Sequence, residues 1–346
     1  MMMSSANLAI PVNSSSPVQN LLVYNAGNFR VGEGANLGDP ISVYEDIQPG
    51  DTYALDDGAR RRRLALQMRL EGGLTIADDT ETGLPGAELH IDCAILLMSP
   101  DGGTTEALVL VEVDEDSDIA AIFLLPLGRL RPRAGYQVVS LDRTGARQKF
   151  ARMACVSFTR GTHITLATGQ QVKIEDLKAG DRVLTRDDGP QEVRWIGQHT
   201  VRAEGDFAPI VITAGTLNNT NDLVISPDHR LFVYQRSDQI GAGRPELLVK
   251  ARHLVNGDTV HVQDGGFVEY FQLLFDRHHI IYAEGIAAES MLVDPRTRPA
   301  LPAELLEKLA AILPQHGGRD LNGLDVQKAL LDRPDAIDLL RRASMQ

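Results

Sequence analysis

Hydroxyl and imidazole side chains recur at short spacings in the second half of the sequence. Ser226 precedes His229 by three residues, and His278 adjoins His279 further along the chain. Ser157 lies upstream, in the segment Ser-Phe-Thr-Arg-Gly-Thr-His-Ile. A serine hydroxyl is a weak nucleophile that needs a general base, and a histidine with an ordinary pKa of about 6.5 exchanges protons near neutral pH. Together, these residue types could support acyl transfer to a serine.

The sequence argues against an ordinary serine hydrolase and against a metal enzyme. The Gly-x-Ser-x-Gly elbow of α/β-hydrolases is absent. Cys93 and Cys155 do not form a Cys-x-x-Cys pair, so a zinc site built on thiolates is not expected. Whether these two cysteines form a disulfide is left open. Four further histidines show no clear metal-binding geometry, and neither a metal nor a cofactor is predicted: His163, His199, His253 and His261.

Length and charge narrow the class of protein. The chain has 346 residues, enough for two domains, and its 43% hydrophobic and 23% charged residues are typical of a globular protein. The net charge of −13 would repel phosphate backbones, so nucleic-acid binding is not expected. The basic run from Arg60 to Arg63 is interpreted as a solvated surface. The acidic stretch from Glu112 to Asp118 is interpreted as a solvated edge rather than a calcium loop, because it lacks EF-hand spacing.

The compartment remains open. No apolar run approaches the ~20 residues of a membrane helix. The N-terminus lacks a charged segment followed by an apolar one, so no Sec signal peptide is recognised. The protein is therefore expected to be cytoplasmic or to be exported by a route other than Sec.

Composition and hydrophobic patterning divide the chain into five parts. The first part is polar and unpatterned, the second is rich in short apolar runs separated by turn signals, and the third is polar and basic. A sandwich-like β domain is the natural prediction for the second part. The expected parts are a disordered tail (1–20), the β-rich N-terminal domain (21–142), a linker (143–156), a second β-rich domain (157–290) and a helical tail (291–346).

Short alternating runs predict an all-β fold for residues 157–290. Eight of these runs are expected to be strands, at 171–174, 182–185, 192–196, 210–213, 231–234, 259–262, 267–274 and 279–283. After Pro299 the apolar spacing becomes helical. Three helices are expected in the tail, at 303–313, 324–331 and 335–342.

Five segments of the second β domain occur in a characteristic order. Residues 157–164 carry Ser-Phe-x-x-Gly-Thr, residues 174–185 carry Leu-x-x-Gly-Asp-x-Val, and residues 225–231 carry Ser-x-x-His. Between and after them lie Val-Arg-Trp-Ile-Gly at 193–197 and a histidine-bearing strand at 275–285. This ordered set resembles a bacterial branch of the Hint family, the self-processing fold shared by hedgehog C-terminal domains and inteins. The resemblance implies an all-β, horseshoe-like domain.

The resemblance also implies a self-processing reaction at the bond before Ser157. The family has a cysteine nucleophile where this chain has Ser157, and Cys155 lies two residues upstream. The Ser157 hydroxyl would attack the carbonyl carbon of Val156 through a five-membered ring, leaving an ester in place of the peptide bond. Ser226 would hydrogen-bond the scissile peptide, and His229 would act as the acid and as the base.

Two further residues are considered for this site. His278 matches the histidine of the family's last block. Asp228 could orient His229, although adjacent side chains of an extended segment point to opposite faces. By the same reasoning, one of His278 and His279 is expected to face the core and the other to face solvent.

Two outcomes remain open at the level of sequence. The chain continues through Glu284 and Gly285 without the His-Asn-nucleophile ending of inteins, so full splicing is not expected. Water or an external nucleophile would then resolve the ester, with the protein's own N-terminal segment, residues 1–156, as the substrate. Alternatively, the domain is a catalytically silent Hint-fold module with a binding or structural role. The sequence does not decide whether the protein is an enzyme.

Overall fold

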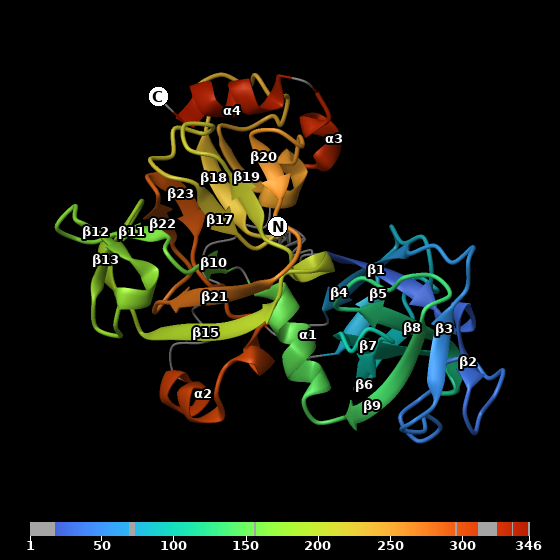
Figure 1. The fold of residues 1–346 in the computed structure, drawn as a ribbon. Coiled ribbons are helices and arrows are strands. Elements are labelled where there is room, and N and C mark those ends of the chain that lie inside the picture. Colours follow the sequence, from blue (N-terminus) through green and yellow to red (C-terminus); the bar gives the residue numbers. More distant parts are fainter. Residues whose placement is uncertain are drawn as a thin grey trace, which may run out of the picture.

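The computed structural model describes residues 18–68, 73–155, 157–294, 296–310, 324–333 and 335–344. The chain is mainly β with a few short helices, as predicted (Figure 1). Most of the expected N-terminal tail lies outside the described residues, and Gln19 already begins the first strand.

The N-terminal domain is one sheet that closes on itself. Its strand order is β2-β3-β9-β6-β5-β4-β1-β8-β7, and an additional pairing between β6 and β7 completes a ring of six strands. The strands are β1 Gln19–Asn25, β2 Phe29–Glu33, β3 Thr52–Leu55, β4 Arg62–Met68, β5 Leu74–Ile76, β6 Glu88–Met98, β7 Thr104–Val113, β8 Ile119–Pro126 and β9 Gly135–Asp142.

Both faces of this sheet are covered by apolar side chains. Along β7, Ala107 and Val109 belong to one hydrophobic cluster, whereas Leu108 and Leu110 belong to another. This division follows from the alternation of side chains across a strand. The near-continuous apolar run of β7 is therefore explained by burial on both faces.

The segment expected to be a linker contains helix α1, Ala146–Ala154. Phe150 of this helix is buried in a core cluster of the N-terminal domain. Cys155, directly after the helix, is buried in a cluster that includes Leu274 and Met291 of the C-terminal half. The helix therefore packs against both halves of the molecule, and Figure 1 shows it between them.

Residues 158–289 form two antiparallel sheets. One has the order β15-β21-β10-β17-β16-β20, and the other has β12-β11-β22-β23-β18-β19, with β13 paired to β22 and β14. The strands are β10 Phe158–Thr159, β11 His163–Thr165, β12 Gln171–Lys173, β13 Arg182–Thr185, β14 Gly189–Glu192, β15 Trp195–Arg202, β16 Ile210–Ile212, β17 Leu223–Ile225, β18 Arg230–Tyr234, β19 Glu246–Lys250, β20 Val260–Val262, β21 Phe267–Leu274, β22 Ile280–Ala283 and β23 Ile286–Glu289.

Short 3₁₀ helices lie between several strands, and one follows the last strand. They are η1 Ala26–Asn28, η2 Ile174–Asp176, η3 Gly205–Phe207, η4 Ala251–Leu254 and η5 Arg298–Ala300. One hydrophobic cluster unites the two sheets of the C-terminal half, with Phe158, Phe271 and Ile281 among its buried members.

The C-terminal helices partly join this core. The helices are α2 Ala303–Leu309, α3 Lys328–Leu331 and α4 Ala336–Ser344. Leu340 of α4 is completely buried in the same cluster as Phe158. Ahead of α3, the Val326 N–H donates to the Leu248 carbonyl at 2.9 Å. The end of the chain is thus an integral part of the second domain. Residues 311–323, where the first predicted tail helix was expected to end, lie outside the described residues.

Candidate functional site

The register of the sheet determines what surrounds Ser157. Phe158 of β10 pairs antiparallel with Ile225 of β17 on one side and with Phe271 of β21 on the other. In antiparallel pairing, one step back along a strand corresponds to one step forward along its neighbour. Ser157 therefore lies between Ser226 and Gln272, and it is only 2% exposed.

Ser157 is held by several hydrogen bonds. Its N–H, which belongs to the peptide bond with residue 156, donates to Ser226 Oγ at 3.0 Å. The Ser226 N–H in turn donates to the Ser157 carbonyl at 2.9 Å. Gln272 Nε2 donates to Ser157 Oγ at 3.0 Å, and this hydroxyl makes a long contact of 3.4 Å with the Cys155 carbonyl. Both the candidate leaving nitrogen and the candidate nucleophile are thereby fixed in place.

His229 lies above the same strand because the chain turns tightly after β17. Its N–H donates to the Ser226 carbonyl at 3.0 Å, and its ring packs edge-on against Phe158 with centroids 4.4 Å apart. Nδ1 is 3.1 Å from the Ser157 carbonyl oxygen, and Nε2 is 3.0 Å from the Glu289 carbonyl oxygen. Carbonyl oxygens only accept hydrogen bonds, whereas a neutral imidazole has a single N–H. Only the imidazolium can donate to both carbonyls.

The protonation of His229 is set by opposing effects. Complete burial lowers the pKa of His229 below its usual value, although the Glu289 carboxylate and the two carbonyls favour the charged form. The ring is accordingly neutral at neutral pH. A proton gained during a reaction would nevertheless meet two acceptors that are already in place.

Behind His229 lies a buried ion pair between Arg230 and Glu289. Arg230 Nε donates to the Glu289 carboxylate at 2.8 and 2.9 Å, Nη2 donates at 2.5 Å, and the Arg230 backbone N–H donates at 3.0 Å. Asp325 contacts the same guanidinium at 3.3 Å. Burial opposes ionisation of Glu289, but Arg230 and His278 hold its pKa well below the usual range.

His278 lies at the edge of the site and does not contact Ser157. Its Nε2 is 3.3 Å from Glu289 Oε2, so it is linked to His229 only through Glu289. His279 instead pairs with Asp188 at 3.1 Å. Both histidines are buried, and the prediction that one of them faces solvent was wrong. They precede β22 rather than belonging to a strand, so the alternation of strand side chains does not apply to them.

Asp228 forms ion pairs with two neighbouring cations. Its carboxylate binds Arg252 at 2.8 Å and Lys250 at 3.5 Å. Lys250 and Arg252 hold the pKa of Asp228 below its usual range in spite of burial. The structure therefore gives no support to Asp228 as the residue that orients the imidazole.

Cys155 is not an alternative nucleophile at neutral pH. Both cysteines are free thiols, and the Cys155 thiol donates to the Ala151 carbonyl at 3.2 Å. Burial raises the pKa of Cys155 to about 12, so the thiol stays protonated. Burial also raises the pKa of Cys93 far above its usual value. Ser157 is the residue whose reactive atom lies at the site.

Gln272 and Glu289 were not predicted from the sequence. Each is a polar residue in or at the end of an apolar strand, β21 or β23, and each is almost completely buried. A polar residue in such a run is a weak signal for a site, because it gains meaning only when the strand register shows what it faces.

Other classes of site receive no support from the described residues. Among them, no group of three or more His, Cys, Asp or Glu side chains is arranged to hold a metal ion. In the acidic stretch, Asp114 Oδ1 accepts hydrogen bonds from the N–H groups of Asp116 and Asp118, so this carboxylate caps its own turn. None of the helices in the described ranges is long and apolar enough to cross a membrane.

The family model of the Hint domain matches residues 156–295. This segment is a Hint domain. The match begins at the bond before Ser157 and includes both sheets, and it leaves the N-terminal β domain and the C-terminal helices outside. Inteins are among the solved structures similar to this chain. A variant of the Ssp DnaB mini-intein has 12% identity and a TM-score of 0.27, with 40% of this chain and 97% of the intein covered. The gp41-1 intein has 13% identity and a TM-score of 0.24, with 38% and 97% covered. No curated protein shows a significant match.

Proposed function

We propose that the Hint domain processes its own chain by an N–O acyl shift at the Val156–Ser157 bond. Ser157 Oγ attacks the carbonyl carbon of Val156, a C–O bond forms, and the C–N bond breaks. The proton lost by the hydroxyl is balanced by the proton gained by the departing nitrogen, which becomes an amine. Because nucleophile and carbonyl belong to adjacent residues, the step is effectively unimolecular.

The hydrogen bond from the Ser157 N–H to Ser226 Oγ, at 3.0 Å, carries this proposal. Ser226 thereby holds the nitrogen that must leave. His229 Nδ1 is 3.1 Å from the carbonyl oxygen of the same serine, so an imidazole contacts the residue whose backbone nitrogen must leave. In this proposal Ser226 positions the scissile peptide, and His229 delivers the proton to the nitrogen.

Gln272 has a different role. Its amide donates to Ser157 Oγ at 3.0 Å and stabilises negative charge that develops on this oxygen during attack. An amide NH₂ group cannot remove a proton, so Gln272 positions the hydroxyl and is not its base. Among the described residues, no imidazole or carboxylate is hydrogen-bonded to this hydroxyl.

The test is to trap the ester in the full-length protein. Samples are quenched in acid, denatured and treated with hydroxylamine, which cleaves esters much faster than amides. Intact mass then identifies residues 1–156 and 157–346. We expect cleavage in the wild type, none in Ser157→Ala, and unchanged cleavage in Ser140→Ala, a control at an exposed serine of the N-terminal domain.

A further variant makes the test sharper. Ser157→Cys should increase the trapped fraction, because a thiol is partly ionised at neutral pH and is the stronger nucleophile. Equal cleavage in the wild type and in Ser157→Ala would contradict the proposal. An intact chain in both the wild type and Ser157→Cys would instead support a non-catalytic Hint-fold module.

A further inference from the structure

Glu289 binds two consecutive residues of the chain through two different groups. Its backbone carbonyl oxygen lies 3.0 Å from His229 Nε2. Its carboxylate accepts a hydrogen bond from the Arg230 backbone N–H at 3.0 Å and further bonds from the guanidinium at 2.5 to 2.9 Å. A single, completely buried residue therefore holds both the imidazole and the backbone directly after it.

The register of two strands brings these groups together. Leu231 of β18 pairs antiparallel with Ala288 of β23. One step back along β18 corresponds to one step forward along β23, so Arg230 lies opposite Glu289. Arg230 is the first residue of β18, and Glu289 is the last residue of β23. The contact with His229 is thus fixed by the sheet and by a buried ion pair.

The ring of His229 has no ionised group in direct contact. Both ring nitrogens face backbone carbonyl oxygens, and Phe158 packs against the ring. A carbonyl oxygen accepts a hydrogen bond but carries no net charge. Any charge that balances an imidazolium at this position must therefore come from groups further away.

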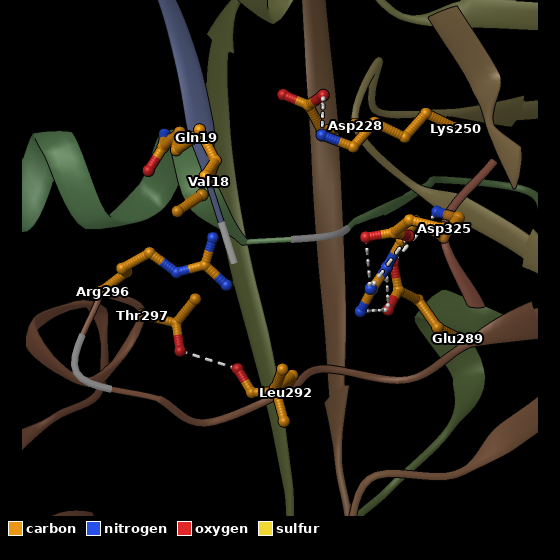
Figure 2. A pocket seen from close by; sticks show the side chains of 11 residues that line it. Val18, Gln19, Asp228, Lys250, Glu289, Leu292, Arg296, Thr297 and Asp325 are labelled. Carbon is orange, nitrogen blue, oxygen red and sulfur yellow. Dashed lines mark hydrogen bonds and ion pairs between the residues drawn. The ribbon is translucent and has the colours of Figure 1, made fainter. Parts of the chain in front are cut away.

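The nearest ion-pair cluster can accept one more positive charge. Arg230 binds both Glu289 and Asp325, the latter at 3.3 Å, and Figure 2 shows these two carboxylates beside each other, with dashed lines to the guanidinium between them. One cation and two carboxylates leave a net charge of −1, which a proton on His229 would cancel. Burial opposes this proton, and the Glu289 carboxylate is the main group that raises the pKa of His229 again.

The remaining charged and titratable groups nearby have partners of their own. Lys250 and Arg252 are paired with Asp228, at 3.5 and 2.8 Å. His278 Nε2 lies 3.3 Å from the Glu289 carboxylate and is the second imidazole that this charge affects. Its titration must therefore be measured separately from that of the candidate acid.

We propose that Glu289 is the positioning residue of the candidate acid; this inference rests on the acyl shift proposed above. Its carbonyl holds the imidazole of His229, and its carboxylate, fixed by Arg230, is the counter-ion of the ring once the ring carries a proton. No hydrogen bond or ion pair of the described structure joins Glu289 to Ser157. Glu289 therefore acts through His229 and not on the reacting atoms.

The first measurement does not depend on cleavage. In full-length Ser157→Ala, NMR of nitrogen-15-labelled histidine follows the protonation of each imidazole, and His229→Gln and His278→Gln assign the two signals. Glu289→Gln keeps the backbone carbonyl but removes the charge. We expect this change to lower the titration midpoint of His229 by about one pH unit.

Glu284 provides the matched control in the same domain. Its side chain is only 1% exposed, and its carboxylate contacts a different imidazole, with His163 Nδ1 at 2.9 Å. Glu284→Gln also removes a buried carboxylate, but it should leave the midpoint of His229 unchanged. A general loss of stability is thereby distinguished from a specific effect on the candidate acid.

A double variant covers the case in which Glu289→Gln does not fold. Arg230→Met/Glu289→Met replaces both charges by apolar side chains, a change that buried ion pairs often tolerate without loss of stability. The effect of Glu289 on the pKa of His229 is larger than that of Arg230. The midpoint of His229 should therefore fall in the double variant as well.

The second measurement tests the consequence for the reaction. With Ser157 restored, acid-quench trapping should show ester formation that is about tenfold slower in Glu289→Gln at pH 6.5, because about tenfold fewer rings are protonated. An unchanged midpoint of His229, an equal shift in Glu284→Gln, or a shifted midpoint with an unchanged rate would overturn the proposal for Glu289. A shifted midpoint in a protein whose wild type forms no ester would instead overturn the acyl shift.

Discussion

The two β domains differ greatly in how many polar side chains they bury. In the described part of residues 18–142, three polar side chains are buried: Gln19, Asp51 and Glu112. In the described part of residues 157–290, sixteen are buried: Ser157, Thr159, Thr162, Thr185, Thr216, Asn219, Ser226, His229, Arg230, Gln235, Gln272, His278, His279, Glu284, Glu289 and Ser290. Burying polar groups is costly unless they are paired. The comparison teaches that the candidate site lies in the domain whose core is built around paired polar groups.

Substituting a buried carboxylate in each domain should give the largest difference in stability loss between the domains. Glu289 is completely buried and ion-paired with Arg230, whereas Glu112 accepts one hydrogen bond, from the Leu84 N–H. Glu289→Gln leaves the Arg230 charge buried without its main partner and should destabilise the Hint domain by about 3 kcal/mol. Glu112→Gln should cost the N-terminal domain about 1 kcal/mol.

Calorimetry and fluorescence can separate these two effects. Trp195 is the only tryptophan of the chain and lies in β15, so its fluorescence follows unfolding of the Hint domain. Differential scanning calorimetry reports both domains. Equal losses of stability in Glu289→Gln and Glu112→Gln would show that the contrast between the domains has no energetic consequence.

The second contrast concerns how the proposed acyl shift depends on pH. The ester form has a free amine at Ser157, with an ordinary pKa of about 7.7 to 8.0, so the ester-to-amide ratio should rise by up to about tenfold for each pH unit below this range. The pKa of His229 is lowered, so the ring gains a proton only as the pH falls below 6.5, and the rate of the shift should rise there. Acid-quench trapping from pH 8 to pH 5.5 measures both quantities.

Histidine variants test whether protonation of His229 causes this rise in rate. His229→Gln should remove the acceleration of the rate, whereas His90→Gln, at an exposed histidine of the N-terminal domain, should leave it unchanged. Stability should change in the opposite direction to the rate. A lowered folded-state pKa gives His229 its full contribution to stability above pH 6.5, and this contribution is lost as the pH falls through the folded pKa. An equal rise in rate with falling pH in His229→Gln and in the wild type would exclude His229 as the acid.

The smallest effect is expected at Asp228. Its carboxylate is partly exposed and binds Arg252 and Lys250. Asp228→Asn should reduce stability by less than about 1 kcal/mol, as is usual for partly exposed ion pairs. Trapped ester should be unchanged. A large loss of ester in this variant would restore Asp228 as the residue that orients His229.

The sequence predicted the parts of the site that lie close together along the chain. Ser226 and His229 share one short turn, and both contact Ser157 in the structure. Gln272 and Glu289 could not be predicted, because their contacts depend on the register of β10 with β21 and on the position of β23. The sequence also predicted about half of the fourteen strands between β10 and β23, those with the clearest alternating runs.

The sequence did not predict helix α1, and the prediction for the histidine pair was wrong, in both cases for physical reasons. The basic residues of 143–156 suggested a linker, but Phe150 anchors α1 in a core that composition alone does not reveal. His278 and His279 were treated as strand residues, yet they lie in the turn before β22, where burial comes from Glu289 and Asp188 rather than from alternation.

Because Cys155 is buried, cleavage before Ser157 would not by itself release the N-terminal fragment. Its side chain lies in a cluster with Leu274, Met291, Val293 and Leu301, all on the far side of the proposed break. A nicked molecule would therefore stay together as a noncovalent pair, with the new end of the first fragment still inserted in the second. It would run as two bands on a denaturing gel and as one species on a sizing column, until partial unfolding withdraws that end.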